Sequence, residues 1–177
     1  MTNYHIFNTE QNPIYMQQSN VFASPGINGA PELDAAKNGV LYILNSGSVS
    51  VGSGSSLLLQ AANPVGSGKR LFVSRVAGGT TAAAALTIAS GGTIAGGTTP
   101  APFNALFGNS AASAATTRQN TGTLGGAPTT VMTMQVTSGM FAIDFSGSLV
   151  VQAGQTISLT LGAGALTGSL NLTWWEA

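Results

Sequence analysis

Few residues of this chain are of the types that catalyse reactions or bind metal ions. His5 is the only histidine, cysteine is absent, and Asp144 and Glu176 are the only carboxylates after residue 38. A nucleophilic triad needs a base held beside a carboxylate, and a metal site needs several ligands in one place. These residues supply neither pattern. The sequence therefore predicts no catalytic residue, no metal site and no cofactor, and we expect the protein not to be an enzyme.

One glycine-rich segment resembles the end of a phosphate-binding loop: residues 66–69 read Gly-Ser-Gly-Lys. Such a loop also needs a glycine where Asn63 stands and a Ser or Thr where Arg70 stands, and a helix must follow it. The residues after Arg70 are instead typical of a strand. We therefore interpret the segment as a turn between two strands.

Charge is scarce and balanced. Charged side chains make up 6% of the 177 residues, with five Lys or Arg against five Asp or Glu, whereas a typical soluble protein has about 25%. Lys69, Arg70 and Arg75 form a small basic cluster, but nucleic-acid binders need a broad basic face. We expect no nucleic-acid partner. A surface with few charges lacks the repulsion that keeps copies apart, so the composition favours association of the protein with itself.

The sequence has no sign of membrane insertion or secretion. No segment reaches the roughly 18 uninterrupted apolar residues of a membrane helix, and the first residues lack the basic and apolar regions of a secretory signal. We expect no membrane partner and synthesis in a cytosol. If the protein is found outside the cell, lysis or a dedicated assembly route would take it there.

Residues 1–38 differ from the rest and are expected to form an extended N-terminal arm ahead of a domain at 39–177. Pro13, Pro25 and Pro31 interrupt the segment, and proline is excluded from helix interiors and central strands. A disordered tail is one interpretation. The other is a docking arm, because apolar extended peptides add to sheet edges or grooves. The candidate self-assembly residues are the large apolar ones: Tyr4, Ile6, Phe7, Ile14, Tyr15, Met16, Val21 and Phe22.

The remainder has the pattern of an all-β protein. Short apolar runs at 40–44, 57–59, 70–76 and 131–137 are separated by turn residues, as in sandwiches and barrels. Phe141, Ile143 and Phe145 alternate with Ala142 and Asp144, which predicts one buried and one exposed face. The same alternation recurs over 157–161 and 170–174. About eight such strands predict a two-sheet antiparallel jelly-roll sandwich.

Two segments do not show this pattern clearly. Residues 80–94 contain four consecutive alanines, but their flanking glycines and internal alternation favour a strand over a helix. Residues 96–128 are rich in glycine and proline and are expected to form a long loop at one end or edge of the sandwich. Within it, Phe103, Leu106 and Phe107 are expected to attach the loop to the core.

The end of the chain, Trp174-Trp175-Glu176, indicates a contact surface. If Trp174 faces the core, Trp175 faces outward, and an outward indole suits an interface better than water. Trp175 is therefore a possible interface residue.

Two segments also resemble known spore proteins. Residues 57–76, which begin Leu-Leu-Leu-Gln, resemble spore-surface proteins of Gram-positive spore-formers. Residues 153–175 resemble the final strands of tumour-necrosis-factor-like jelly rolls, such as the trimeric heads of exosporium collagen-like fibres. An apolar arm ahead of a jelly roll is similar in layout to the endospore appendage (spore pilus) subunit family. A collagen-like stalk is absent, which argues against a stalked head.

The resemblance implies a structural function. In appendage pilins the arm of one subunit docks into the next and a fibre grows on the spore surface; because this chain lacks their N-terminal cysteines, it resembles a cysteine-free branch held non-covalently. The implied partners are copies of the chain itself, as trimers in a fibre, and a spore-surface anchor protein. The implied location is extracellular, on the spore. The alternative is a phage fibre or decoration protein, or another module whose 96–128 loop meets a glycan or host surface.

Overall fold

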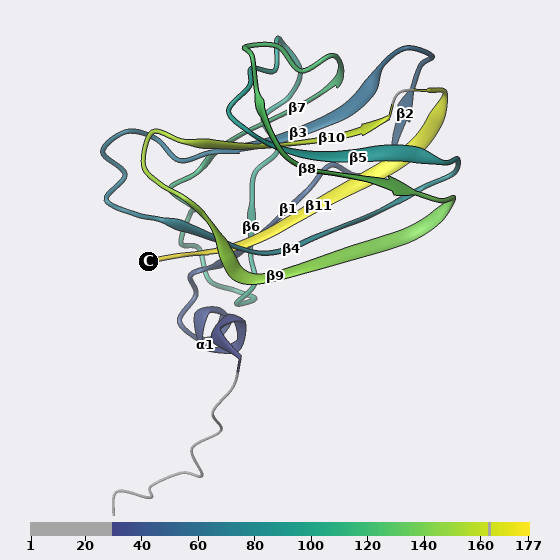
Figure 1. The fold of residues 1–177 in the computed structure, drawn as a ribbon. Coiled ribbons are helices and arrows are strands. Elements are labelled where there is room, and N and C mark those ends of the chain that lie inside the picture. Colours follow the sequence, from purple (N-terminus) through teal and green to yellow (C-terminus); the bar gives the residue numbers. More distant parts are fainter. Residues whose placement is uncertain (1–29, 163) are drawn as a thin grey trace, which may run out of the picture.

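The computed structural model describes residues 30–162 and 164–177, which form a β-sandwich preceded by a short helix (Figure 1). The helix is α1 (Pro31–Lys37). The strands are β1 (Leu41–Asn45), β2 (Val49–Val51), β3 (Ser56–Ala62), β4 (Leu71–Thr80), β5 (Ala84–Ser90), β6 (Phe103–Asn104), β7 (Thr116–Gly122), β8 (Thr129–Val136), β9 (Gly139–Val151), β10 (Thr156–Gly162) and β11 (Leu166–Glu176).

The strands form two antiparallel sheets with the topology of a jelly roll. One sheet has the order β6-β1-β11-β4-β9, with β2 also paired to β11, and the other has the order β7-β3-β10-β5-β8. The long strands pair from the outside of the sequence inward: β1 with β11, β3 with β10, β4 with β9 and β5 with β8. This nested pairing confirms the predicted fold class, an all-β two-sheet antiparallel jelly-roll sandwich.

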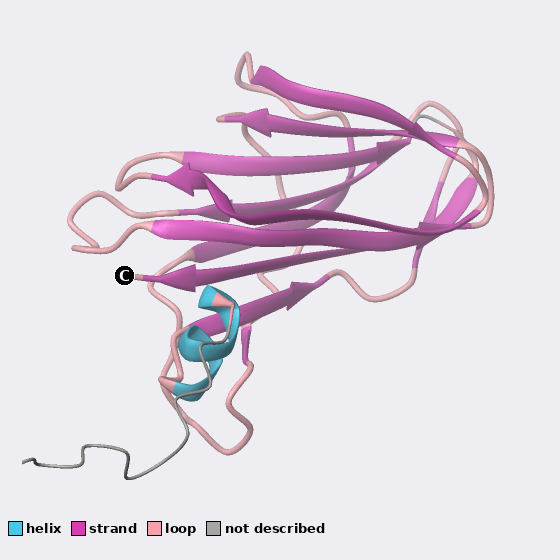
Figure 2. Cartoon of the chain, turned by 60° about the horizontal axis from the view of Figure 1, so that its bottom comes forward, coloured by secondary structure: helices cyan, strands magenta, loops and turns pink. Residues whose placement is uncertain are grey.

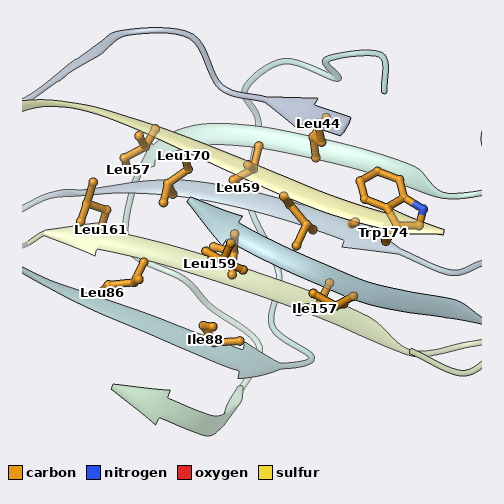
Figure 3. Close-up of a cluster of buried hydrophobic side chains, with 14 of the residues drawn as sticks. Leu44, Leu57, Leu59, Leu86, Ile88, Ile157, Leu159, Leu161, Leu170 and Trp174 are labelled. Atoms are coloured by element: carbon orange, nitrogen blue, oxygen red, sulfur yellow. The ribbon is translucent and has the colours of Figure 1, made fainter. Parts of the chain in front are cut away.

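The core lies between the sheets and follows the alternation of the sequence. Leu159 in β10 and Leu172 in β11 are fully buried, and the next inward position of β11 holds Trp174. Figure 3 shows Leu159 and Trp174 in this cluster of buried side chains. Phe141, Ile143 and Phe145 also pack against this core, as predicted, but they remain partly exposed because β9 is an edge strand. Asp144 faces out.

The alanine-rich segment contains a strand, as expected. Strand β5 takes up the part from Ala84 to Ser90 and pairs with β10 and β8. Leu86 and Ile88 face the core, where both are fully buried. Alanine prefers a helix by only a few tenths of a kcal/mol per residue. Burial of the large alternating side chains in the sandwich contributes more free energy than this preference, so the segment forms a strand.

Part of the predicted arm is helical, which corrects the expectation of an extended chain over 31–37. Pro31 occupies the first helical turn, where a missing N–H costs nothing and the fixed φ suits a helix. Ala35 is buried, and Ser74 in β4 donates a hydrogen bond of 3.2 Å to Glu32. These contacts hold α1 at one end of the six-stranded sheet (Figure 2). The domain boundary expected at residue 39 stays a prediction.

The segment 96–128 is not a single loop at the edge. It contributes β6 to the six-stranded sheet, beside β1, and β7 to the five-stranded sheet, beside β3. The turn at Gly91 and Gly92, just before this segment, lies over the outer face of the five-stranded sheet. There Gln60 donates a hydrogen bond to the carbonyl of Gly92, and Ser158 donates one to the carbonyl of Gly91. The segment therefore crosses from one sheet to the other. Short polar strands of this kind, such as Thr116–Gly122, lack the apolar alternation that would reveal them in the sequence.

Candidate functional site

The eight apolar side chains predicted to mediate self-assembly lie outside the described residues, and their role stays a prediction: Tyr4, Ile6, Phe7, Ile14, Tyr15, Met16, Val21 and Phe22. His5 lies outside them as well. A surface that binds such an arm would lie on the described part of the chain, residues 30–162 and 164–177.

Trp175 points away from the core, as the alternation predicts. Its indole stacks on Phe72 with ring centroids 5.5 Å apart and planes 7° from parallel. The indole also lies over Gly147, where a Cβ atom would collide with it. Trp175 is therefore half-buried by its own sheet. Only the part of the indole that stays exposed is available to contact another molecule.

Most charged groups of the sandwich have partners within the chain. Arg75 and Asp144 form an exposed ion pair across β4 and β9. Arg118 donates a hydrogen bond of 3.1 Å to the carbonyl of Gly96. The basic cluster expected from the sequence is thus divided, because Arg75 is neutralised by a carboxylate on the neighbouring strand.

Glu176 is the one buried carboxylate of the described residues. It accepts hydrogen bonds from the hydroxyl of Ser113, from the backbone N–H of Ala114 at 3.1 Å and from Nε1 of Trp174 at 3.2 Å. Three donors compensate for the burial of its charge. The sequence reasoning missed this role, although the alternation 170, 172, 174 continues to 176 and places Glu176 on the inner face.

Tyr42 lies beside this carboxylate. Its hydroxyl donates a hydrogen bond of 3.2 Å to the carbonyl of Ala112, and its ring packs 6.2 Å from that of Trp174. Burial raises the pKa of the Tyr42 phenol above its ordinary value of 10.0, and the negative charge of Glu176 raises it further. Tyr42 and Glu176 together fasten residues 112–114 to β1 and β11.

The Gly-Ser-Gly-Lys segment is a turn, as interpreted from the sequence. Gly66 and Gly68 have φ values of 80° and 68°, which glycine adopts without strain. The Asn63 side chain donates hydrogen bonds to the carbonyl groups of Lys69, at 2.8 Å, and Val151, at 3.1 Å. Asn63 therefore closes the turn and joins it to the end of β9, which explains why an amide stands where a phosphate-binding loop has glycine.

The two sides of the sandwich, where the edges of the two sheets lie next to each other, differ in how well they cover the core. On the side of β1 and β3, which we call the closed side, the crossing segment 103–122 links the two sheets. Gln119 in β7 donates a hydrogen bond of 2.8 Å to the carbonyl of Ser46, next to β1. The buried Asn104 in β6 donates one of 2.7 Å to the carbonyl of Gly39. The core is covered by the chain itself along this side.

On the other side, β8 ends the five-stranded sheet and β9 ends the six-stranded sheet. We call the region between them the seam. Its inward-facing side chains pack against the core but are only partly buried: Met132, Met134, Phe141, Ile143, Phe145 and Leu149. At one end the seam opens into a groove of about 250 Å³, which Ile88, Val131 and Ile157 help to line. None of the lining residues is charged.

A second exposed apolar feature lies on the crossing segment. Phe103 and Phe107 pack edge to face, with ring centroids 5.2 Å apart. Both are exposed, Phe107 to 85%, and so is Leu106. The expectation that these three side chains attach the segment to the core is therefore wrong. The polar residue between them, Asn104, makes that attachment instead.

Within the described residues, no three His, Cys, Asp or Glu side chains gather into a group able to hold a metal ion. The helix in this part of the chain is too short to cross a bilayer. No protein-family model, curated protein or solved structure matches the chain.

Proposed function

We propose that the protein is a structural subunit that assembles with copies of itself into a non-covalent extracellular filament on endospores. The observation that carries the proposal is the seam: a complete jelly roll keeps a row of core side chains partly exposed along one edge. Apolar groups facing water favour association, at roughly 25 cal/mol for each Å² buried. With few charges present, electrostatic repulsion between copies is weak.

The N-terminal arm supplies the link between subunits. Residues 2–22 carry eight large apolar side chains and a single carboxylate, Glu10. Burying each such side chain contributes about 1.5–3 kcal/mol, so several together offset the entropy of ordering the arm. Head-to-tail contacts of this kind generate open filaments when the rotation between subunits does not close a ring. Trimers as building blocks and an anchor protein on the spore follow from the family resemblance.

Electron microscopy of the purified protein tests the proposal. We expect regular filaments from the full chain, and we expect high salt to leave them intact because few charges are involved. Deletion of residues 1–22 should leave a folded β-rich domain, since the core cluster begins at Tyr42. That domain should be monomeric or trimeric and unable to elongate. Identical filaments from the truncated protein would show that the arm does not link the subunits.

A surface-binding module, such as a phage fibre or decoration protein, is the second candidate. The exposed pair of Phe103 and Phe107 favours it, because accessible aromatic rings are common at binding surfaces. Binding of the full chain to immobilised glycans, with Phe107→Ala as the matched variant, distinguishes the two. Glycan binding that Phe107→Ala abolishes, without filaments, would favour this second function.

A further inference from the structure

We infer that the seam is the receiving site for residues 1–22 of a neighbouring copy. The inference rests on the proposed function, since it names the surface at which one subunit holds the arm of the next. The occupant is the apolar N-terminal segment, and it enters the groove at the open end of the seam, which residues of β5, β8, β9 and β10 line.

The seam lacks the cover that the rest of the core has. Six of the eight partly buried side chains that pack against the core belong to β8 and β9. Both strands end their sheets, so within residues 30–162 and 164–177 each presents one row of backbone N–H and C=O groups without a strand partner. An extended peptide can pair with such an edge while its alternate side chains fill the space behind it.

The shape of the seam sets where the peptide enters. Only Thr137 and Ser138 join β8 to β9, so the two sheets are held close at that end. The strands separate along their length (Figure 1), and the groove lies at the far end, beside Val131 and Leu149. Residues 145–148 of β9 lie opposite the single residue Ser74 of β4, and a bulge of this kind bends an edge strand. The open end of the seam is therefore accessible to a peptide.

The arm has the composition that this groove requires. Tyr4 and Ile6 are two residues apart, as are Ile14 and Met16, so an extended arm presents each pair on one face. The groove is uncharged and lined by apolar and small polar groups, and residues 1–22 carry one carboxylate, Glu10. Neither partner buries an unpaired charge when the arm occupies the groove, provided that Glu10 stays at the rim.

The length and origin of the arm are sufficient for a contact between copies. The arm joins the sandwich through α1, which lies at one end of the six-stranded sheet. Twenty-nine residues precede Ala30, and fully extended they span at most about 100 Å. If residues 4–22 bind the seam, residues 23–29 remain as a connector of at most about 25 Å, rich in glycine with one proline.

Cross-linking in the full chain tests the inference. Tyr15 is replaced by the photoreactive p-benzoylphenylalanine, and unlabelled protein is mixed with ¹⁵N-labelled protein before assembly. Mass spectrometry then shows which peptides are joined and whether they come from different copies. We expect cross-links from residue 15 to 129–136 and 145–151, in pairs that combine labelled and unlabelled chains.

Two charged variants of the full chain complete the test. Val131→Lys with Ser148→Lys introduces two charges into the groove at residues that are already exposed, Val131 to 51%, so the fold should persist. Val65→Lys with Ser53→Lys adds the same charge at exposed positions outside the groove and outside β8 and β9, Val65 being 89% exposed. We expect the groove variant to lose both filaments and cross-links to the seam, and the control variant to keep both.

The outcomes separate this inference from the proposed function. Filaments that need the arm but give cross-links elsewhere, for example at Phe103 and Phe107, overturn the seam and leave the function standing. Cross-links only within single copies overturn docking between copies. Equal loss of filaments in both variants overturns the specific role of the groove. Filaments that form without residues 1–22 show that the arm is not the link and overturn the inference, while the absence of filaments from the full chain overturns the proposed function itself.

Discussion

The closed side and the seam belong to one sandwich but are completed in different ways. On the closed side, a segment that crosses between the sheets covers the core, and buried polar groups such as Glu176 and Asn104 hold it with several hydrogen bonds each. Along the seam, partly exposed apolar side chains lie between two strand edges that have no strand partner in the described part of the chain. The closed side is completed within the chain, whereas the seam is suited to completion by another chain.

The largest effect is expected at the centre of the core. Leu159 is fully buried in β10, and Leu159→Ala should lower the free energy of unfolding by about 2–5 kcal/mol, as other large-to-small core changes do. Ile143→Ala in the seam should cost less, about 1–2 kcal/mol, because the side chain is only partly buried. Urea unfolding of the two variants measures the difference. Equal costs would mean that the seam is as well covered as the centre.

The next effect concerns the polar attachment of the closed side. Glu176→Ala leaves the donors of Ser113, Ala114 and Trp174 without their acceptor. Each unsatisfied buried group costs about 1–3 kcal/mol, and partial access of water reduces the sum, so we expect a loss of about 2–4 kcal/mol. Asp144→Ala is the matched control, since its exposed pair with Arg75 contributes about 0–1 kcal/mol. A comparable loss in both variants would contradict the anchoring role of Glu176.

The smallest effect is a pH dependence at Tyr42. Because its pKa is raised in the folded protein, the fold holds the phenol proton above the pH at which the unfolded chain releases it. The resulting stability is complete below the unfolded value of 10.0 and is lost as the pH rises through the folded value. Unfolding of the native protein and of Tyr42→Phe, at pH about 8 and about 10.5, measures it. Between the two pH values the native protein should lose more unfolding free energy than Tyr42→Phe. Equal losses in the two proteins would show that Tyr42 does not cause the pH dependence.

The sequence was sufficient for the parts of the fold that depend on alternation. Leu159, Leu172 and Trp174 face inward because every second residue of a strand lies on the same face. This alternation can be recognised from a few neighbouring residues of the sequence. The same rule includes Glu176, but a carboxylate at an inner position indicates burial only once its donors are known. Those donors come from residues 113–114, more than sixty positions away, so no local pattern identifies them.

The remaining differences have similar causes. Phe103 and Phe107 are apolar, which predicts burial, but Phe103 in β6 and Phe107 in the turn after it are exposed, whereas Asn104 is buried and hydrogen-bonded. Pro31 is incompatible with a helix interior, but it stands at the start of α1, a position that proline favours. The seam depends on which strands end the two sheets, and this follows from pairing between distant segments rather than from the pattern of any single strand.

Hydrogen exchange of the full chain and of the protein without residues 1–22 shows whether the arm binds along the seam. Exchange at individual peptides reports which backbone amides gain partners on assembly. We expect slower exchange in the full chain at β8 and at the end of β9, with little change at β1 and β6 on the closed side. Equal exchange at β8 and β9 in the two proteins, or protection gained only around Phe103–Phe107, would contradict it.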